Sequence, residues 1–226
     1  GNPQRSGANF KQAQEIAAGS LLKQFVIDRK KAYSFASVDG QTIKASQGKT
    51  DAFLRYLTME IDGAIHTIKR RLAIHMYGDG FGTLGVQSGA ITTKTITLAD
   101  VNDITNFEVG MWLTIYDGPG AVIRTRVASA PLPANTFQVD AVDRTNGTVT
   151  LDVAPGGSGT NDVLYAYGDI SQDPDTAGYT GDCVAGLASW IPSNRTLTTG
   201  NPLFDDFFGV NRSTDPTRLG GIYYDG

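Results

Sequence analysis

The stretch Thr50–Tyr77, TDAFLRYLTMEIDGAIHTIKRRLAIHMY, decides how the fold is interpreted. Its apolar residues recur at spacings of three and four, which is the period of one face of an α-helix. Thr50 or Asp51 can cap the start of this helix, and Gly78 can end it. A helix of this length measures roughly 40 Å, which is long for a chain of this size. We therefore expect a spine helix, whose buried stripe consists of Leu54, Leu57, Ile61, Ile65, Ile68, Leu72 and Met76. A charge on that stripe, as in Leu57→Asp, is expected to unfold the subunit.

The residues before this helix suggest an arm and an extended hairpin. Residues 1–24 begin polar and become amphipathic, with Phe10, Ala13, Ala17 and Leu21 at helical spacing. Residues 25–47 predict two strands joined by a tight turn at Asp39-Gly40, because glycine readily adopts positive φ. Few bulky apolar residues follow that turn, and an isolated two-stranded hairpin is marginal in water. Arm and hairpin are therefore both expected to need a partner outside their own subunit.

The residues after the helix change to short alternating apolar runs. Within 88–168, six such runs are separated by turn residues such as Asn146-Gly147, a pattern typical of a small antiparallel barrel or sandwich. We expect this β-module to be an insertion. Residues 169–226 are rich in Gly, Asp, Asn and Pro, with a short helix predicted within Val184–Trp190.

Composition narrows the possible function. The 226 residues are 40% hydrophobic and 19% charged, as in globular proteins, and the net charge is −4. A general nucleic-acid binder would more often carry a basic excess. The basic runs Arg29-Lys30-Lys31 and Lys69-Arg70-Arg71 are interpreted as solvated faces. Apolar runs stay well short of the roughly 18 residues that a membrane span requires, so no membrane contact is expected.

The residues that could carry chemistry do not form a recognisable catalytic or metal-binding motif. Cys183 is the single cysteine and is interpreted as a small buried apolar residue. His66 and His75 are nine residues apart, which is not a zinc spacing. The glycine-rich stretch 78–82 follows a helix, whereas phosphate-binding loops follow a strand. We expect no enzyme, cofactor or metal site. A carboxylate pair for glycoside hydrolysis stays open, because only spatial separation would reveal one.

Several stretches resemble the major capsid protein of tailed bacteriophages, whose fold is shared with encapsulins and the herpesvirus capsid floor. The most specific is Phe207–Leu219, FFGVNRSTDPTRL; the others are Phe25–Lys31 running into Asp39-Gly40, Glu60–His66, Phe107–Met111 and Ala141–Arg144. The resemblance implies an α+β phage major-capsid fold. Its parts would be an N-terminal arm (1–24), an extended β-hairpin loop (25–47), a spine helix with its exit loop in the peripheral domain (48–87), the inserted β-module (88–168), and a return into the peripheral and axial domains (169–226) that is incomplete at its C-terminus.

The resemblance also implies a structural function. Copies would form hexamers and pentamers of an icosahedral phage head that encloses DNA without sequence-specific binding, together with portal, scaffold and decoration proteins. The protein would lie in the virion capsid, and in the host cytoplasm during assembly. Inter-subunit contacts are expected at Phe10, Leu21, Arg29, Lys30, Lys31, Tyr33, Phe35, Asp39, Gly40 and Lys44. Two alternatives remain: a nanocompartment shell like that of encapsulins, or a carbohydrate- or surface-binding β-module whose aromatic residues include Trp112 and Trp190.

Overall fold

The computed structural model describes residues 6–16, 22–27, 29–38, 40–45, 50–89, 93–117, 123–126, 135–157, 159, 161–169, 182–191 and 207–221. The chain divides into two compact units. The first comprises residues 1–29 and 195–220, and the second comprises residues 30–194 and 221–226.

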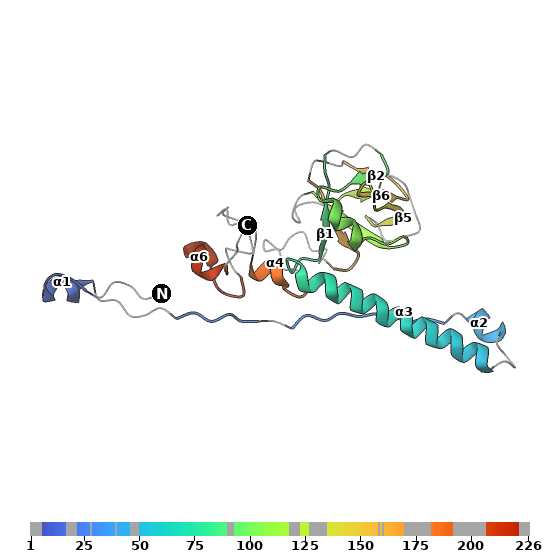
Figure 1. Cartoon of the computed structure of the whole chain (residues 1–226), viewed down its shortest axis with the longest axis horizontal. Coiled ribbons are helices and arrows are strands. Elements are labelled where there is room, and N and C mark those ends of the chain that lie inside the picture. The colour runs from blue at the N-terminus through green and yellow to red at the C-terminus, as the bar shows by residue number, and fades with distance from the viewer. Residues whose placement is uncertain are drawn as a thin grey trace. The chain divides into compact units, whose positions relative to one another are not determined.

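A six-stranded antiparallel sheet is the main structure of the second unit (Figure 1). Its strand order is β1-β8-β3-β5-β6-β2, so neighbours in space are mostly not neighbours in sequence. The strands are β1 (Thr83–Val86), β2 (Thr95–Thr97), β3 (Trp112–Tyr116), β5 (Phe137–Asp143), β6 (Thr148–Leu151) and β8 (Val163–Ala166). Antiparallel strands are therefore present over 88–168 as expected, and the sheet also includes β1, which lies in the range that the sequence analysis assigned to the exit loop.

The two outer strands of this order meet and close the sheet into a barrel. Gln87, directly after β1, forms an antiparallel bridge with Leu98, directly after β2. The backbone N–H of Ala99 also donates to the carbonyl oxygen of Val86 at 2.7 Å. Closure leaves fewer unpaired backbone groups at the sheet edges, where another chain could otherwise add a strand.

Alternating residues of these strands fill the barrel. On β6, for example, Val149 and Leu151 are buried while Thr148 and Thr150 are partly exposed. The short 3₁₀ helix η1 (Val101–Asn106) adds Ile104, and Phe107 follows it into the same core. The full cluster is Leu84, Ile96, Leu98, Ile104, Phe107, Leu113, Ile115, Phe137, Val139, Val149, Leu151 and Leu164.

Strands β3 and β8 are buried on both faces. On the side away from the barrel core, Tyr116 and Tyr165 pack edge to face with ring centroids 5.6 Å apart. Phe81 and Ile123 lie against this second cluster. A two-stranded ribbon of β4 (Thr125–Arg126) and β7 (Pro155–Gly156) continues from Ile123, which bridges to β3.

The predicted hairpin turn at Asn146-Gly147 joins β5 to β6, as expected. The Asp143 carboxylate accepts hydrogen bonds from the backbone N–H groups of Thr145 (2.9 Å) and Asn146 (3.2 Å). Gly147 has a φ of +64°, and a Cβ at this position would lie 2.8 Å from Val101. Glycine is required here both for the turn and for the approach of η1.

The predicted hairpin over 25–47 is wrong. Thr42–Ala45, expected as its return strand, lies within helix α2 (Gly40–Ala45). Residues 30–38 are extended, and they run beside helix α3 (Thr50–Tyr77), where the Ser34 hydroxyl donates to the Ala64 carbonyl at 3.0 Å (Figure 1). A lone two-stranded ribbon has too little apolar contact to be stable. In the described part of the chain, segment 30–38 contacts the surface of α3 instead of pairing with a second strand.

The predicted fold class is also wrong. The described residues form mainly an antiparallel barrel with one long helix, and not an α+β phage major-capsid fold around a spine helix. Helix α3 has the expected range, but its stripe is not buried as a spine would be: Leu54, Ile61, Ile65, Leu72 and Met76 are all exposed. The prediction that Leu57→Asp unfolds the subunit loses its premise, because most of the stripe is exposed among the described residues; Leu57 itself is half-buried.

The remaining described elements are short. Helix α1 (Phe10–Glu15), η2 (Arg212–Thr214) and α6 (Pro216–Leu219) belong to the first unit, and α4 (Leu187–Trp190) belongs to the second. Helix α4 lies within the range predicted from sequence. Among the described helices, none combines the length and apolar character needed to cross a bilayer.

The barrel core generates a stability prediction. Phe137→Ala removes a fully buried ring and is expected to lower the free energy of unfolding by about 3–5 kcal/mol. Urea unfolding followed by tryptophan fluorescence checks this. Val109→Ala is the control, because Val109 is 65% exposed on the same module. Equal urea midpoints for the two variants would contradict the assigned core.

Candidate assembly surfaces and a buried polar junction

Large apolar side chains are exposed in the extended segments of both units. In the first unit, Leu22 is 93% exposed, and Val26 and Ile27 are also exposed. In the second unit, Tyr33 is 78% and Phe35 is 89% exposed. Contiguous exposed apolar residues are uncommon on soluble monomers and mark interaction surfaces.

Helix α3 adds a second uncovered surface in the second unit. Between the start of the helix and its contacts with the barrel, Leu54, Ile61 and Ile65 are at least 43% exposed. Amphipathic periodicity of this kind forms when one face of a helix is buried. The described residues of this chain leave much of that face exposed.

The first unit is held together by the stretch 207–219. The backbone N–H of Val26 donates to the Phe208 carbonyl at 2.9 Å, and the Phe25 ring packs on Phe207. The buried Arg212 guanidinium lies 3.6 Å from the centroid of the Phe207 ring, which is a cation–π contact. Beside this contact is a pocket of about 540 Å³, lined by Leu22, Lys23, Phe25, Val210, Asn211, Thr214, Asp215, Arg218 and Leu219.

The predicted contact residues lie mostly on exposed parts of the chain. Phe10 is on α1 and is 83% exposed. The exposed residues also include Arg29, Lys30, Lys31, Tyr33, Phe35, Gly40 and Lys44. Leu21 and Asp39 are outside the described residues. Sequence reasoning missed Leu22, Val26 and Ile27, and assigned the stripe of α3 to a core. Periodicity identifies an apolar face but not the chain that covers it.

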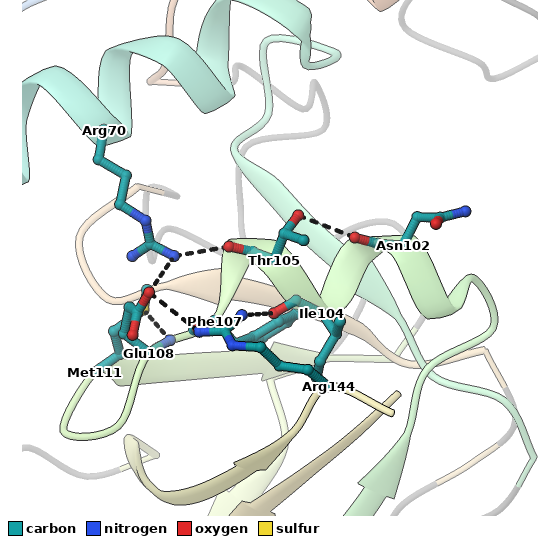
Figure 2. Close-up of polar contacts among 8 residues, drawn as sticks. All are labelled: Arg70, Asn102, Ile104, Thr105, Phe107, Glu108, Met111 and Arg144. Carbon is teal, nitrogen blue, oxygen red and sulfur yellow. Dashed lines mark hydrogen bonds and ion pairs between the residues drawn. The ribbon is translucent and has the colours of Figure 1, made fainter. Parts of the chain in front are cut away.

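Arg70 connects α3 to the barrel, and Arg144 of the barrel contacts the same Glu108 carboxylate, as Figure 2 shows. Arg70 of α3 donates to the Thr105 carbonyl at 2.8 Å and pairs with the Glu108 carboxylate at 3.2 Å. Arg144, at the end of β5, donates to the carbonyls of Ile104 and Phe107 and also contacts Glu108. Both side chains thus bind carbonyls at the C-terminal end of η1, where helices favour cations, and the Ile104 carbonyl also accepts from the Phe107 N–H at 3.2 Å.

A buried polar junction connects the end of α3 to two other segments. It consists of Arg71, His75, Asp169 and Cys183. Asp169, which follows β8, is 1% exposed; its Oδ1 pairs with Arg71, and its Oδ2 lies 3.2 Å from Nε2 of His75. The Cys183 thiol contacts the backbone carbonyl of Asp169 at 3.5 Å. A buried carboxylate requires such partners, because its desolvation is otherwise very costly.

Burial controls the protonation of this junction. Desolvation is the main cause that lowers the pKa of His75 below its usual range, and the nearby Arg71 cation lowers it further. Desolvation raises the pKa of the Cys183 thiol to about 11. The thiolate needed for nucleophilic catalysis is therefore scarce at neutral pH. The prediction that Cys183 is buried is confirmed, while His75 proves to be part of a polar cluster and His66 is exposed.

The backbone of Gly82 packs closely against one side of the junction. The exit from α3 turns at Asp79, whose carboxylate accepts from the Phe81 N–H at 2.9 Å. Gly82 then adopts a φ of +78°, and a Cβ on it would lie 2.7 Å from the Cys183 sulfur and 2.9 Å from Cβ of Asp169. A larger residue at this position would displace both groups.

Arg70→Ala is expected to lower the free energy of unfolding by about 1 kcal/mol, because it removes a carbonyl contact and a half-exposed ion pair. Urea unfolding measures the change. Arg55→Ala, an exposed site on the same helix, is the matched control and should shift the midpoint less. A larger effect at Arg55 would contradict the role of Arg70.

The Cys183 thiol is expected to react slowly with a thiol-specific reagent in the folded protein and rapidly in urea, because it is 6% exposed and protonated. The measurement is the rate of colour release by a disulfide reagent, with EDTA present throughout. Equal rates in the two conditions would show that the junction is open.

Comparison with protein-family models, with curated proteins and with solved structures found no match to this chain.

Proposed function

We propose that this chain is a structural coat subunit that assembles with copies of itself into a closed shell. The observation that carries the proposal is the exposed apolar surface formed by the extended segment 30–38 and helix α3. Both elements carry bulky side chains, yet much of their apolar surface stays accessible within the described chain. That surface is what a neighbouring copy would cover.

Burial of this surface favours association. Each large apolar side chain contributes roughly 1.5–3 kcal/mol when it is fully removed from water. Several of them together can exceed the cost of immobilising two chains, which is estimated at 4–15 kcal/mol. Phe35, Tyr33, Leu54 and Ile61 are exposed by 89%, 78%, 52% and 43%. The surface is thus of the right kind for stable self-association.

Two features of the sequence support a virus-type shell in particular. The stretch 207–219 resembles a characteristic segment of tailed-phage major capsid proteins, and it organises the first unit through Phe207 and Arg212. The net charge of −4 suits a container that encloses DNA without gripping it. We infer a coat protein of hexamers and pentamers in the virion, assembled in the host cytoplasm with portal, scaffold and decoration proteins and acting without catalysis.

The direct test is negative-stain electron microscopy with sedimentation velocity on the full-length protein, expressed alone and with its neighbouring genes. Closed shells that contain DNA would support a phage coat. Closed shells that hold protein cargo would support the nanocompartment alternative. A monomer under every condition would overturn self-assembly, and a glycan-binding screen of the barrel would then test the remaining alternative.

Phe35→Asp is expected to abolish shell or capsomer formation and to leave the circular dichroism of the subunit unchanged. The added charge lies on a surface that is exposed in the subunit and would be buried in the proposed assembly. Val109→Asp is the control, because it adds the same charge at an apolar side chain that is 65% exposed on the barrel, outside segment 30–38 and α3. Sedimentation velocity measures the assembly state of both variants. If Phe35→Asp assembles like the control, segment 30–38 is not an interface.

A further inference from the structure

We propose that His75, Asp169 and Cys183 form a binding site for a zinc-class divalent cation. Each residue offers one ligand atom, and these atoms all lie within 4.8 Å of one another. All three side chains are buried, with exposures of 6%, 1% and 6%. This inference is independent of self-assembly, because every ligand comes from a single subunit.

The donor set indicates which metal would bind. Imidazole nitrogen, carboxylate oxygen and cysteine sulfur are the three zinc ligands found in proteins, whereas magnesium and calcium take oxygen donors. In tetrahedral zinc sites, bond lengths of 2.0–2.3 Å place neighbouring donor atoms roughly 3.3–3.7 Å apart. Nε2 of His75 and Oδ2 of Asp169 are already 3.2 Å apart. The Cys183 sulfur lies within 4.8 Å of both atoms, so small side-chain rotations would bring it to coordination distance.

The surroundings of the cluster resemble a built site. Arg71 pairs with Oδ1 of Asp169, while Oδ2 faces Nε2 of His75, so a metal would replace the His75–Asp169 contact and bind both atoms. An outer partner of this kind orients a ligating carboxylate. Gly82 brings backbone against both Cys183 and Asp169 where a Cβ would not fit, so the cluster is enclosed on that side. The positive charge of Arg71 opposes a dication, so a weaker affinity is expected than for a four-ligand structural site.

A bound metal would connect three segments that are distant in sequence. His75 lies near the end of α3, Asp169 follows β8, and Cys183 precedes α4. On binding, the Cys183 thiol releases its proton to solvent, and the sulfur donates to the metal as thiolate. Because the metal binds the folded arrangement and not the separated ligands, it would raise the melting temperature in a concentration-dependent way.

The experiment uses the full-length, unassembled protein after EDTA treatment and dialysis. Cobalt(II) is titrated in as a spectroscopic probe for zinc. The expected result is a thiolate-to-cobalt charge-transfer band that saturates at one metal per chain, is displaced by zinc, and accompanies a rise in melting temperature. Circular dichroism before titration confirms that each sample is folded.

Three variants identify the ligands. Cys183→Ser should lose the charge-transfer band. His75→Gln should weaken zinc binding at least tenfold, because mutation of a residue that only supports a ligand already weakens metal binding by about that factor. His66→Gln is the matched control, because His66 is exposed on the same helix, and it should bind like the unaltered protein. If the unaltered protein shows no band and no thermal shift, the cluster is a metal-free polar junction. A band that survives in Cys183→Ser, or is lost in His66→Gln, would place the metal elsewhere and overturn the proposal.

Discussion

Closure of the sheet between β1 and β2 is the constraint on which the second unit depends. The bridge from Gln87 to Leu98 turns an open six-stranded order into a barrel and encloses twelve buried apolar residues. Without it, Leu84 on β1 and Ile96 on β2 would lie on edge strands open to water. The barrel in turn provides the rigid surface to which the end of α3 is attached.

That attachment relies on polar groups more than on apolar contact. Ile74 of α3 packs against the barrel core, but the other contacts described between them are made by Arg70, Arg71 and His75. Two of these bind Asp169, a carboxylate that is almost fully buried and would be very unfavourable alone. Such pairs have strict geometry, so they define the direction in which the helix leaves the barrel more than they add stability.

The consequence is a subunit with a well-packed module and a poorly covered helix. In the barrel, large apolar residues are enclosed, whereas on α3 and in segment 30–38 they face solvent. One chain thus combines a self-sufficient core with surfaces that gain stability only when they are covered. This division is the structural basis of the self-assembly proposed above.

The sequence alone determined the local features. It specified the range of α3 through its three- and four-residue spacing, the antiparallel strands through alternation, the turn at Asn146-Gly147, and the burial of Cys183. These depend on backbone preference and on neighbours within a few residues. Only the tertiary structure decided that Thr42–Ala45 is helical, that β1 meets β2, that the stripe of α3 is exposed, and that His75 meets Asp169 across 94 residues of sequence. The reason is physical: periodicity shows that a face is apolar or that a residue is polar, but the partner that satisfies it is chosen by packing among distant segments.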